Sequence, residues 1–245
     1  MIDIHCHILP GADDGSASME DSLMMARMAV AGGVNTVIAT PHCNLPYVDD
    51  PNYISDRLRD RYIELISALR DEKIPLKILP GAEVMATPDL AELIENKRVL
   101  TLAGSRYLLT EFFFGEDEEY ITGMLGKVIE AGLRPIVAHP ERYRAVHRRP
   151  EVVEEWVQEG CIIQLNKGSI LGHFGRRVKM ASEWILCRGL AHIVASDAHG
   201  CEQRTPHMAE ISAVLERAYG ASTARLLLEE NPRRIINDEE RILLP

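Results

Sequence analysis

The sequence lacks the features that define several large classes of protein. No apolar run approaches the roughly 18 residues that a membrane-spanning helix needs. Residues 1–5 contain neither a basic segment nor an apolar one, so we expect no secretory signal peptide. Positive charge is scarce: 27 Lys and Arg residues stand against 37 Asp and Glu residues, a formal net charge of -10, which argues against a nucleic-acid binder. We therefore expect a cytoplasmic protein with no membrane span and no nucleic-acid partner.

Several catalytic motifs are also missing. The chain has 5 cysteines, an odd number, and no two of them have a C-x-x-C spacing, which argues against a disulfide framework and a zinc knuckle. No cysteine is followed six positions later by arginine, so the phosphate loop of the cysteine-dependent phosphatases is absent. A Walker-type phosphate loop and a G-x-S-x-G elbow are absent too. These absences exclude several common mechanisms of hydrolysis.

A short apolar run followed by a helical pattern recurs along the chain. These runs are rich in β-branched residues and do not alternate, which is typical of parallel strands buried on both faces. They cover residues 2–4, 36–39, 77–79, 107–110, 135–138, 161–165 and 192–195. Helices are predicted over about 18–32, 55–69, 117–131, 150–159, 176–188, 207–219 and 221–230, with another beginning near Pro88. Seven strand–helix units predict an α/β fold in one domain over residues 1–245, a seven-stranded barrel, with a doubly wound open sheet as the alternative.

Metal-binding residue types follow six of the seven predicted strands. His5 and His7 end the first strand and share a face of an extended chain, so both can reach one metal ion. The remaining residues of this kind are His42, Glu83, Glu111, His139, Asp197 and His199, with Asp13 and Asp14 in the loop after the first strand. The carboxyl ends of parallel barrel strands meet on one face, and His, Asp and Glu suit zinc, manganese or iron. The sequence therefore predicts a site for more than one metal ion.

These motifs together resemble the polymerase and histidinol phosphatase (PHP) superfamily. The resemblance rests on the D-x-H-x-H start at residues 3–7, on His42, on Gly81-Ala82-Glu83, on His139-x-x-Arg142 and on Ser196-Asp197-x-His199, and it extends from Asp3 to Arg233. Within the superfamily, the chain is most similar to the bacterial manganese-dependent tyrosine-protein phosphatases of capsule and exopolysaccharide operons. The stretches that carry this finer likeness are residues 13–15, 105–107 and 206–210.

The resemblance implies a distorted, TIM-like (β/α)7 barrel of the PHP type that holds three divalent metal ions, manganese in the first place, with iron, zinc or magnesium as alternatives. It implies that the first metal is held by His5, His7, Glu83 and Asp197. The second shares Glu83 and adds Glu111 and His139, and the third is held by Asp14, His42 and His199, where Asp13 is the alternative to Asp14. Arg142 and Arg204 match the phosphate-binding arginines of the family, and a planar guanidinium suits a phosphate dianion.

The implied activity is that of a metal-dependent phosphoric monoester hydrolase, a protein-tyrosine phosphatase. A metal-bridging hydroxide would attack the phosphorus of phosphotyrosine in line. The implied partner is an autophosphorylated tyrosine kinase that controls capsular or exopolysaccharide synthesis. Two alternatives stay open: a phosphomonoesterase acting on histidinol phosphate or another small molecule, and a non-catalytic metal-binding regulatory barrel. A nuclease fits the acidic composition less well.

Two surface features have open interpretations. Four methionines of the first predicted helix, at positions 19, 24, 25 and 28, indicate core packing or an interface of a homo-oligomer. His147, Arg148 and Arg149 form a basic patch after the fifth predicted strand. This patch either recruits an acidic, phosphorylated tail or is an ordinary solvated face.

Overall fold

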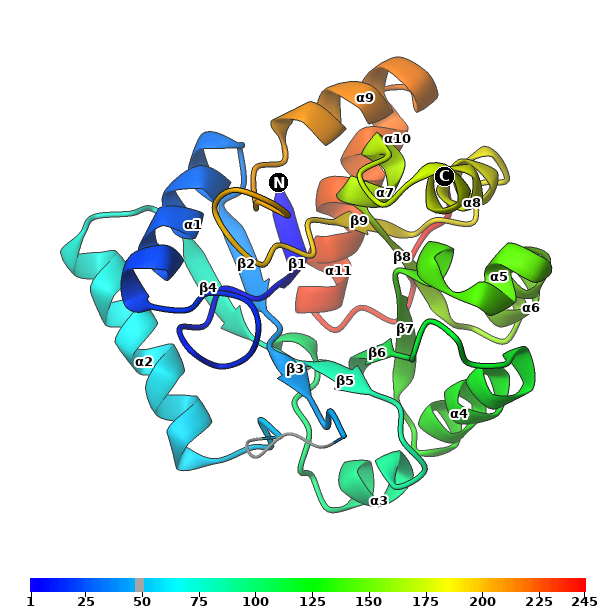
Figure 1. Ribbon diagram of the computed structural model, residues 1–245, viewed down its shortest axis with the longest axis horizontal. Helices are drawn as coiled ribbons and strands as arrows, with labels where there is room; N and C mark the ends of the chain where they lie inside the picture. The colour runs from blue at the N-terminus through cyan, green and yellow to red at the C-terminus, as the bar shows by residue number, and fades with distance from the viewer. Residues whose placement is uncertain (47–50) are drawn as a thin grey trace.

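The computed structural model describes residues 1–46 and 51–245, with strands around the centre of the molecule and helices outside them (Figure 1). The strands are β1 (Ile2–Cys6), β2 (Thr36–Ala39), β3 (His42–Cys43), β4 (Lys77–Pro80), β5 (Glu83–Met85), β6 (Tyr107–Glu111), β7 (Arg134–Ala138), β8 (Ile162–Asn166) and β9 (Ile193–Ala195). The longer helices are α1 (Met19–Ala31), α2 (Asp56–Asp71), α4 (Glu118–Glu130), α6 (Val152–Gln158), α8 (Arg176–Cys187) and α9 (Ala209–Tyr219). The shorter ones are α3 (Leu90–Glu95), α5 (Arg144–Arg148), α7 (Lys167–Leu171), α10 (Ala221–Arg225) and α11 (Asn231–Ile236).

All strand pairs are parallel, in the orders β1-β2-β4 and β3-β5-β6-β7-β8-β9. β3 follows β2 after two residues, and β5 follows β4 after two residues. The two sheets therefore contain seven strand-like runs in chain order. This is the arrangement of a distorted (β/α)7 barrel, and it favours the predicted barrel over an open sheet.

The first and last runs meet along a seam. A parallel bridge pairs Cys6 with Ala198 just beyond β9. The His7 amide donates to the Ala198 carbonyl at 2.8 Å, and the Asp197 amide donates to the His5 carbonyl at 2.9 Å. The buried Asp3 carboxylate accepts hydrogen bonds from the backbone and hydroxyl of Ser196. These bonds bring the carboxyl ends of β1 and β9 together.

Two layers of apolar side chains explain why the strands are buried on both faces. A smaller cluster, which includes Ile4, Leu109 and Ile136, fills the space between strands. A larger cluster, which includes Val37 and Val137, packs the strands against the surrounding helices. Each strand therefore has apolar residues on both of its faces, and this is why apolar and polar residues do not alternate along the predicted strands.

Helix ends follow local sequence rules. Ser18 caps α1 by accepting from the Asp21 amide, as its place before an acidic first turn predicts, and Ser55 caps α2 in the same way. All seven predicted strands are present, to within two residues at each end. The sequence did not predict β3 and β5, and it also missed the short helices α5, α7 and α11. The helix predicted over 221–230 is α10 followed by a π-helical turn over Leu226–Glu230.

No helix among the described residues is long and apolar enough to cross a membrane.

Candidate metal centre

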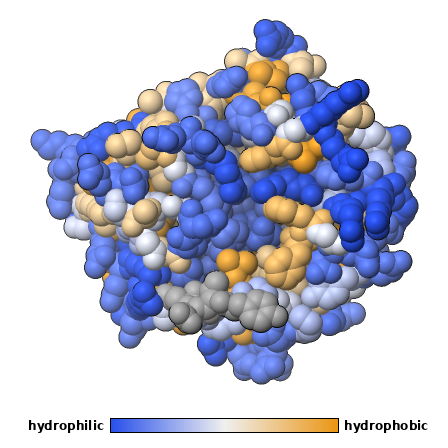
Figure 2. All heavy atoms as spheres, viewed as in Figure 1, coloured by the Kyte–Doolittle hydropathy of each residue, from blue (hydrophilic) through white to orange (hydrophobic). Residues whose placement is uncertain are grey.

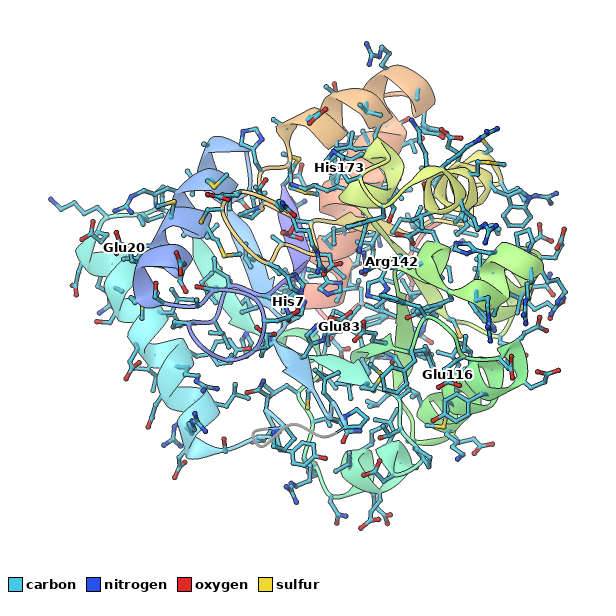
Figure 3. All side chains as sticks on the ribbon, viewed as in Figure 1. His7, Glu20, Glu83, Glu116, Arg142 and His173 are labelled. Carbon is cyan, nitrogen blue, oxygen red and sulfur yellow. The ribbon has the colours of Figure 1, made fainter. Side chains whose placement is uncertain are left out.

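The carboxyl ends of the strands meet on one face of the barrel, and a cluster of histidines and carboxylates lies there. In Figure 3 the side chains of His7, Glu83 and Arg142 all lie near the middle of this face. The same region is hydrophilic in Figure 2, with hydrophobic side chains on part of its rim. The structure brings together all nine predicted metal ligands and both predicted arginines.

The innermost group comes from β1, β5 and the end of β9. The register of β1 against β2 shifts between Asp3 and Cys6, and Cys6 packs in the outer apolar cluster. His5 and His7, on either side of Cys6, approach each other with their Nε2 atoms 3.2 Å apart. Glu83 Oε2 lies 3.1 Å and 3.2 Å from these two nitrogens. Asp197 Oδ1 completes the group at 3.4 Å and 3.6 Å.

Glu83 also belongs to a second group. Its Oε1 lies 2.8 Å from His139 Nε2, and Glu111 Oε1 lies 3.5 Å from the same nitrogen. His42 Nδ1 is 3.1 Å from Glu83 Oε2 and 3.3 Å from Glu111 Oε2. Glu83 therefore presents both oxygens to different neighbours, which is the geometry of a carboxylate that bridges two cations.

A third, more open group surrounds Asp14. Its Oδ1 lies 3.5 Å from His42 Nε2 and 3.5 Å from His199 Nε2, and its side chain is 69% exposed. Asp13, whose side chain is 5% exposed, points elsewhere: its Oδ2 lies 2.7 Å from His7 Nδ1 and accepts from the His42 amide at 2.7 Å. The geometry thus favours Asp14 as the ligand and Asp13 as the residue that orients two histidines.

The loop that carries both aspartates passes very close to β1. A Cβ built on Gly15 would lie 2.3 Å from the His7 carbonyl oxygen and 2.4 Å from the His7 Cβ. The Gly15 amide donates to Asp13 Oδ1 at 3.0 Å. Only glycine allows so close an approach. The absence of a side chain at Gly15 therefore lets the loop place the carboxylates of Asp13 and Asp14 beside the histidines.

Several buried nitrogen and oxygen atoms of the cluster have no hydrogen-bond partner, and this shows whether the cluster fits metal ions. Buried polar atoms in proteins nearly always have a partner. Among the described residues, six such atoms of the cluster have none: His42 Nδ1, Glu83 Oε2, Glu111 Oε2, His139 Nδ1, Asp197 Oδ1 and His199 Nε2. Imidazole nitrogens and carboxylate oxygens are the donors that manganese, iron and zinc accept. The cluster therefore fits divalent cations.

The charges of the cluster are strongly coupled. Burial raises the pKa values of Glu83 and Asp197, but the histidines around them outweigh burial and hold both pKa values well below their usual range. Burial lowers the pKa of His7, whereas the Asp13 carboxylate raises it well above its usual value. Burial and the neighbouring His7 lower the pKa of His199 to about 2. Positive charge beside the Glu83 and Asp197 carboxylates thus favours their ionised form.

Two residues that the sequence did not predict, Gln164 and Asn166, hold these side chains in place. Gln164 Oε1 lies 2.9 Å from His5 Nδ1, and the side-chain Nδ2 of Asn166 donates to Asp197 Oδ2. Such partners fix which ring nitrogen of a histidine faces a metal. One signal was available: Gln164 and Asn166 are polar residues two apart within the apolar run of β8, so they share one face.

Both predicted arginines lie against Asp197. Arg204 Nη2 is 2.5 Å from Asp197 Oδ2, and Arg142 Nη1 is 3.4 Å from the same oxygen. The Arg142 guanidinium is stacked between two rings, 4.2 Å from the Phe114 centroid and 4.8 Å from the Phe174 centroid. Such cation–π contacts orient an arginine while its N–H groups remain free to bind an anion.

Comparison with known proteins identifies relatives over nearly the whole chain. A family model described as capsular polysaccharide synthesis, CpsB/CapC, matches residues 1–237. The tyrosine-protein phosphatase YwqE of Bacillus subtilis (strain 168) is 37% identical over 233 residues, which is 94% of this chain and 89% of that protein. The tyrosine-protein phosphatase CpsB of Streptococcus pneumoniae is 32% identical over 244 residues, 98% of this chain and 99% of the relative.

A solved structure agrees with these relatives. It matches with a TM-score of 0.92 and 35% identity, covering 100% of this chain and 97% of its own. It comes from work on YwqE from Bacillus subtilis and CpsB from Streptococcus pneumoniae, described as unique metal-dependent tyrosine phosphatases.

Proposed function

The chain belongs to the CpsB/CapC family of capsular polysaccharide synthesis proteins, and from this we propose that it is a metal-dependent protein-tyrosine phosphatase. Residues 1–245 then form one phosphatase domain. The observation that carries the proposal is the overlap of three ligand groups beside two arginines. A site that hydrolyses a phosphate monoester needs cations to offset the charge of the phosphate, and guanidinium groups to hold its oxygens.

The ligand groups support an assignment of three divalent ions, with manganese as the first candidate and iron, zinc or magnesium as alternatives. His5, His7, Glu83 and Asp197 form the first set. Glu83, Glu111 and His139 form the second, and Asp14, His42 and His199 form the third. Bound divalent ions supply Lewis acidity, which lowers the pKa of a water molecule and neutralises charge on the phosphate.

The two arginines bind the phosphate in this mechanism. Each is partly exposed, with 17% of the Arg142 side chain and 27% of the Arg204 side chain accessible. Asp197 Oδ2 holds both guanidinium groups on the side of the ligand cluster. Arg204 is fixed further by its Nε, which donates to the Asp197 carbonyl at 3.2 Å. Two positioned guanidinium groups orient the ester and stabilise the charge that develops on its oxygens.

An aromatic side chain at the rim supports an aryl ester as substrate. Phe114 is 43% exposed, its ring centroid is 6.0 Å from that of His139, and it stacks on Arg142. Phe114 stacks on the guanidinium that holds the phosphate in this proposal, so its ring is available to a phenyl group attached to that phosphate. Offset stacking of two such rings contributes about 0.5–1.5 kcal/mol beyond the burial of their surfaces.

The exposure of the outer groups supports a protein substrate rather than a small enclosed one. Asp14 is 69% exposed, although the deepest ligands His5 and His7 are fully buried. The ligand cluster therefore begins at the surface, where a tyrosine on a protein chain can reach it. The partner in this proposal is the phosphorylated tyrosine kinase of a polysaccharide-export system, met in the cytoplasm. Assembly of the phosphatase into a homo-oligomer stays a prediction.

The experiment that tests the proposed function is hydrolysis of a phosphotyrosine peptide by chelator-treated protein, with manganese, iron, zinc and magnesium returned separately. Phosphate release that depends on added metal supports the proposal. The variant Glu83→Gln keeps the shape of the central ligand but removes its charge. It is expected to lose bound metal and activity together.

Glu64→Gln is the matched control, because Glu64 is an exposed glutamate of α2 outside the ligand groups. This variant should keep the activity of the parent protein. Histidinol phosphate is assayed in parallel, and release from that ester alone would favour the small-molecule alternative. Absence of turnover on both esters, with metal shown to be bound, would leave the regulatory barrel.

A further inference from the structure

A groove of about 550 Å³ lies between α5 and α8, outside the ligand cluster. Its apolar part includes Val146, Met180 and Trp184, and Met180 is 56% exposed. Every ionisable side chain that lines it is basic: His147, Arg176 and Arg177. A net-acidic chain with a formal charge of -10 therefore carries a groove whose own charge is positive.

The arginines of this region fall into two sets. Arg149 pairs with Glu118 and Glu155, and Arg188 pairs with Glu154. Within residues 1–46 and 51–245, no ion pair is found for Arg148, Arg176 or Arg177. The unpaired set lines or adjoins the groove, so its charge is available to a ligand.

The position of Arg176 and Arg177 is also electrostatically unfavourable for α8, the helix that contains them. Both occupy the first turn of α8, and that turn contains no acidic residue. The amino end of a helix carries partial positive charge, so cations are unfavourable there. An anion bound in the groove would offset both the helix end and the two guanidinium groups.

The helices that form the groove are adjacent in the chain to the segments that position Arg142. The turn Pro140–Arg142 leads directly into α5, and α8 packs against that turn. Phe174, which stacks on Arg142, stands two residues before Arg176. In Figure 1, α5 and α8 lie side by side to the right of the ring of strands, and Figure 3 places Arg142 between the middle of the face and these helices.

We infer that the α5–α8 groove is a docking site for an acidic peptide segment that flanks the phosphotyrosine. This inference rests on the proposed function, because it uses Arg142 as the point where the phosphate is held. Carboxylates of the segment pair with Arg176 and Arg177, and its apolar side chains lie against Met180 and Trp184. The groove thus selects among phosphotyrosine proteins by charge, whereas the ligand cluster, the two arginines and Phe114 recognise only the phosphate and the aryl ring.

The test compares two phosphotyrosine peptides of equal length, one with Asp and Glu on both sides and one with Asn and Gln at the same places. The double variant Arg176→Ala/Arg177→Ala is expected to lose about fivefold in kcat/KM on the acidic peptide, mainly through KM, because exposed ion pairs are individually weak. Hydrolysis of the neutral peptide and of p-nitrophenyl phosphate should stay within about twofold of the parent protein. The preference for the acidic peptide should decline as salt concentration rises.

Two further variants separate charge from structure. Arg176→Lys/Arg177→Lys keeps the charge and should retain most of the preference. Arg59→Ala/Arg70→Ala removes the same charge from exposed positions on α2, across the molecule from α8, and should leave the preference unchanged. An equal loss in this second control would show that net charge alone is responsible and would overturn the proposal.

Other outcomes also overturn the docking site. The proposal is wrong if the parent protein has equal kcat/KM values on the acidic and the neutral peptide. It is also wrong if the Arg176→Ala/Arg177→Ala variant loses as much kcat/KM on p-nitrophenyl phosphate as on the acidic peptide. A loss of binding to phosphatidylserine vesicles, without any change on the peptides, would reassign the groove to a membrane surface. Direct binding of the fluorescent acidic peptide is measured as well, so that a failure of catalysis is distinguished from a failure of docking.

Discussion

Asp13 and Asp14 are adjacent in sequence but differ in environment, and replacing each by asparagine separates their roles. The Asp13 carboxylate is 5% exposed and contacts His7 Nδ1 and the amides of Gly15 and His42. The Asp14 carboxylate is 69% exposed and faces His42 and His199. We expect Asp13→Asn to affect both folding and metal affinity, and Asp14→Asn to affect chemistry with little effect on folding.

The contacts of Asp13 set the magnitude. An asparagine has one acceptor oxygen where Asp13 has two, so either the Gly15 amide or the His42 amide loses its acceptor. An unsatisfied buried N–H costs about 1–3 kcal/mol, and because both amides are only part-buried, Asp13→Asn should lower the free energy of unfolding by about 1 kcal/mol, the lower end of that range. Loss of a carboxylate that orients metal-binding histidines typically weakens metal binding about 10–100-fold. High metal concentration should therefore restore much of the activity.

Asp14→Asn is expected to behave in the opposite way. An exposed substitution without buried contacts changes the free energy of unfolding by about 0.5 kcal/mol or less. The variant removes a charged donor from the outermost ligand group, so its affinity for the ion held there should fall, and its kcat should fall roughly tenfold or more at the metal concentration that saturates the parent protein.

Two measurements check this pair of variants. Urea unfolding of chelator-treated protein gives the stability change, and metal titration of p-nitrophenyl phosphate hydrolysis gives the half-saturating concentration and the kcat. The reasoning is refuted if Asp13→Asn keeps the metal affinity of the parent protein. It is equally refuted if Asp14→Asn is the more destabilising of the two.

Two further predictions concern Phe114 and His192. Phe114→Leu should lower kcat/KM on phosphotyrosine about three- to tenfold through loss of ring stacking; an equal loss on an alkyl phosphate would show that the ring acts only through Arg142. Burial and Arg134 lower the pKa of His192 to about 4, so the folded protein keeps this histidine neutral while the unfolded chain binds a proton below pH ~6.5. The resulting stability is full above that pH and declines by roughly 3 kcal/mol as the pH falls towards 4; urea unfolding of chelated protein should show this decline, reduced in His192→Asn.

The sequence predicted the fold well where buried strands repeat. Each predicted run is apolar because it is covered on two sides, and that burial leaves a pattern that can be read without coordinates. The sheet is interrupted at residues 40–41 and 81–82, and no pattern in the sequence marks these interruptions. β3 and β5 contain only two and three residues, too few for any periodicity to show.

The clustering of the candidate ligands could be predicted because their residue types are costly to bury at strand ends without a partner. The choice between Asp13 and Asp14 was not predictable. Two adjacent aspartates have the same chemistry, and only the close approach of Gly15 to β1 decides which carboxylate faces His7 and which faces His199. The aromatic rings around Arg142 were missed for a similar reason: Phe114 and Phe174 are 60 positions apart, and only the fold brings them together.

The same bonds close the barrel and shape the candidate metal centre. His139, Asp197 and Arg204 all have left-handed backbone conformations, with φ of 35°, 49° and 48°. Such conformations are unfavourable for residues other than glycine, and they persist only where surrounding contacts enforce them. The conformation of Asp197 is enforced by the hydrogen bond that its backbone N–H donates to the His5 carbonyl, one of the bonds of the seam between β1 and β9. The hydrogen bonds that close the ring of strands therefore offset the backbone strain at the candidate ligands. A substitution that weakens these bonds should displace the candidate ligands before it unfolds the chain.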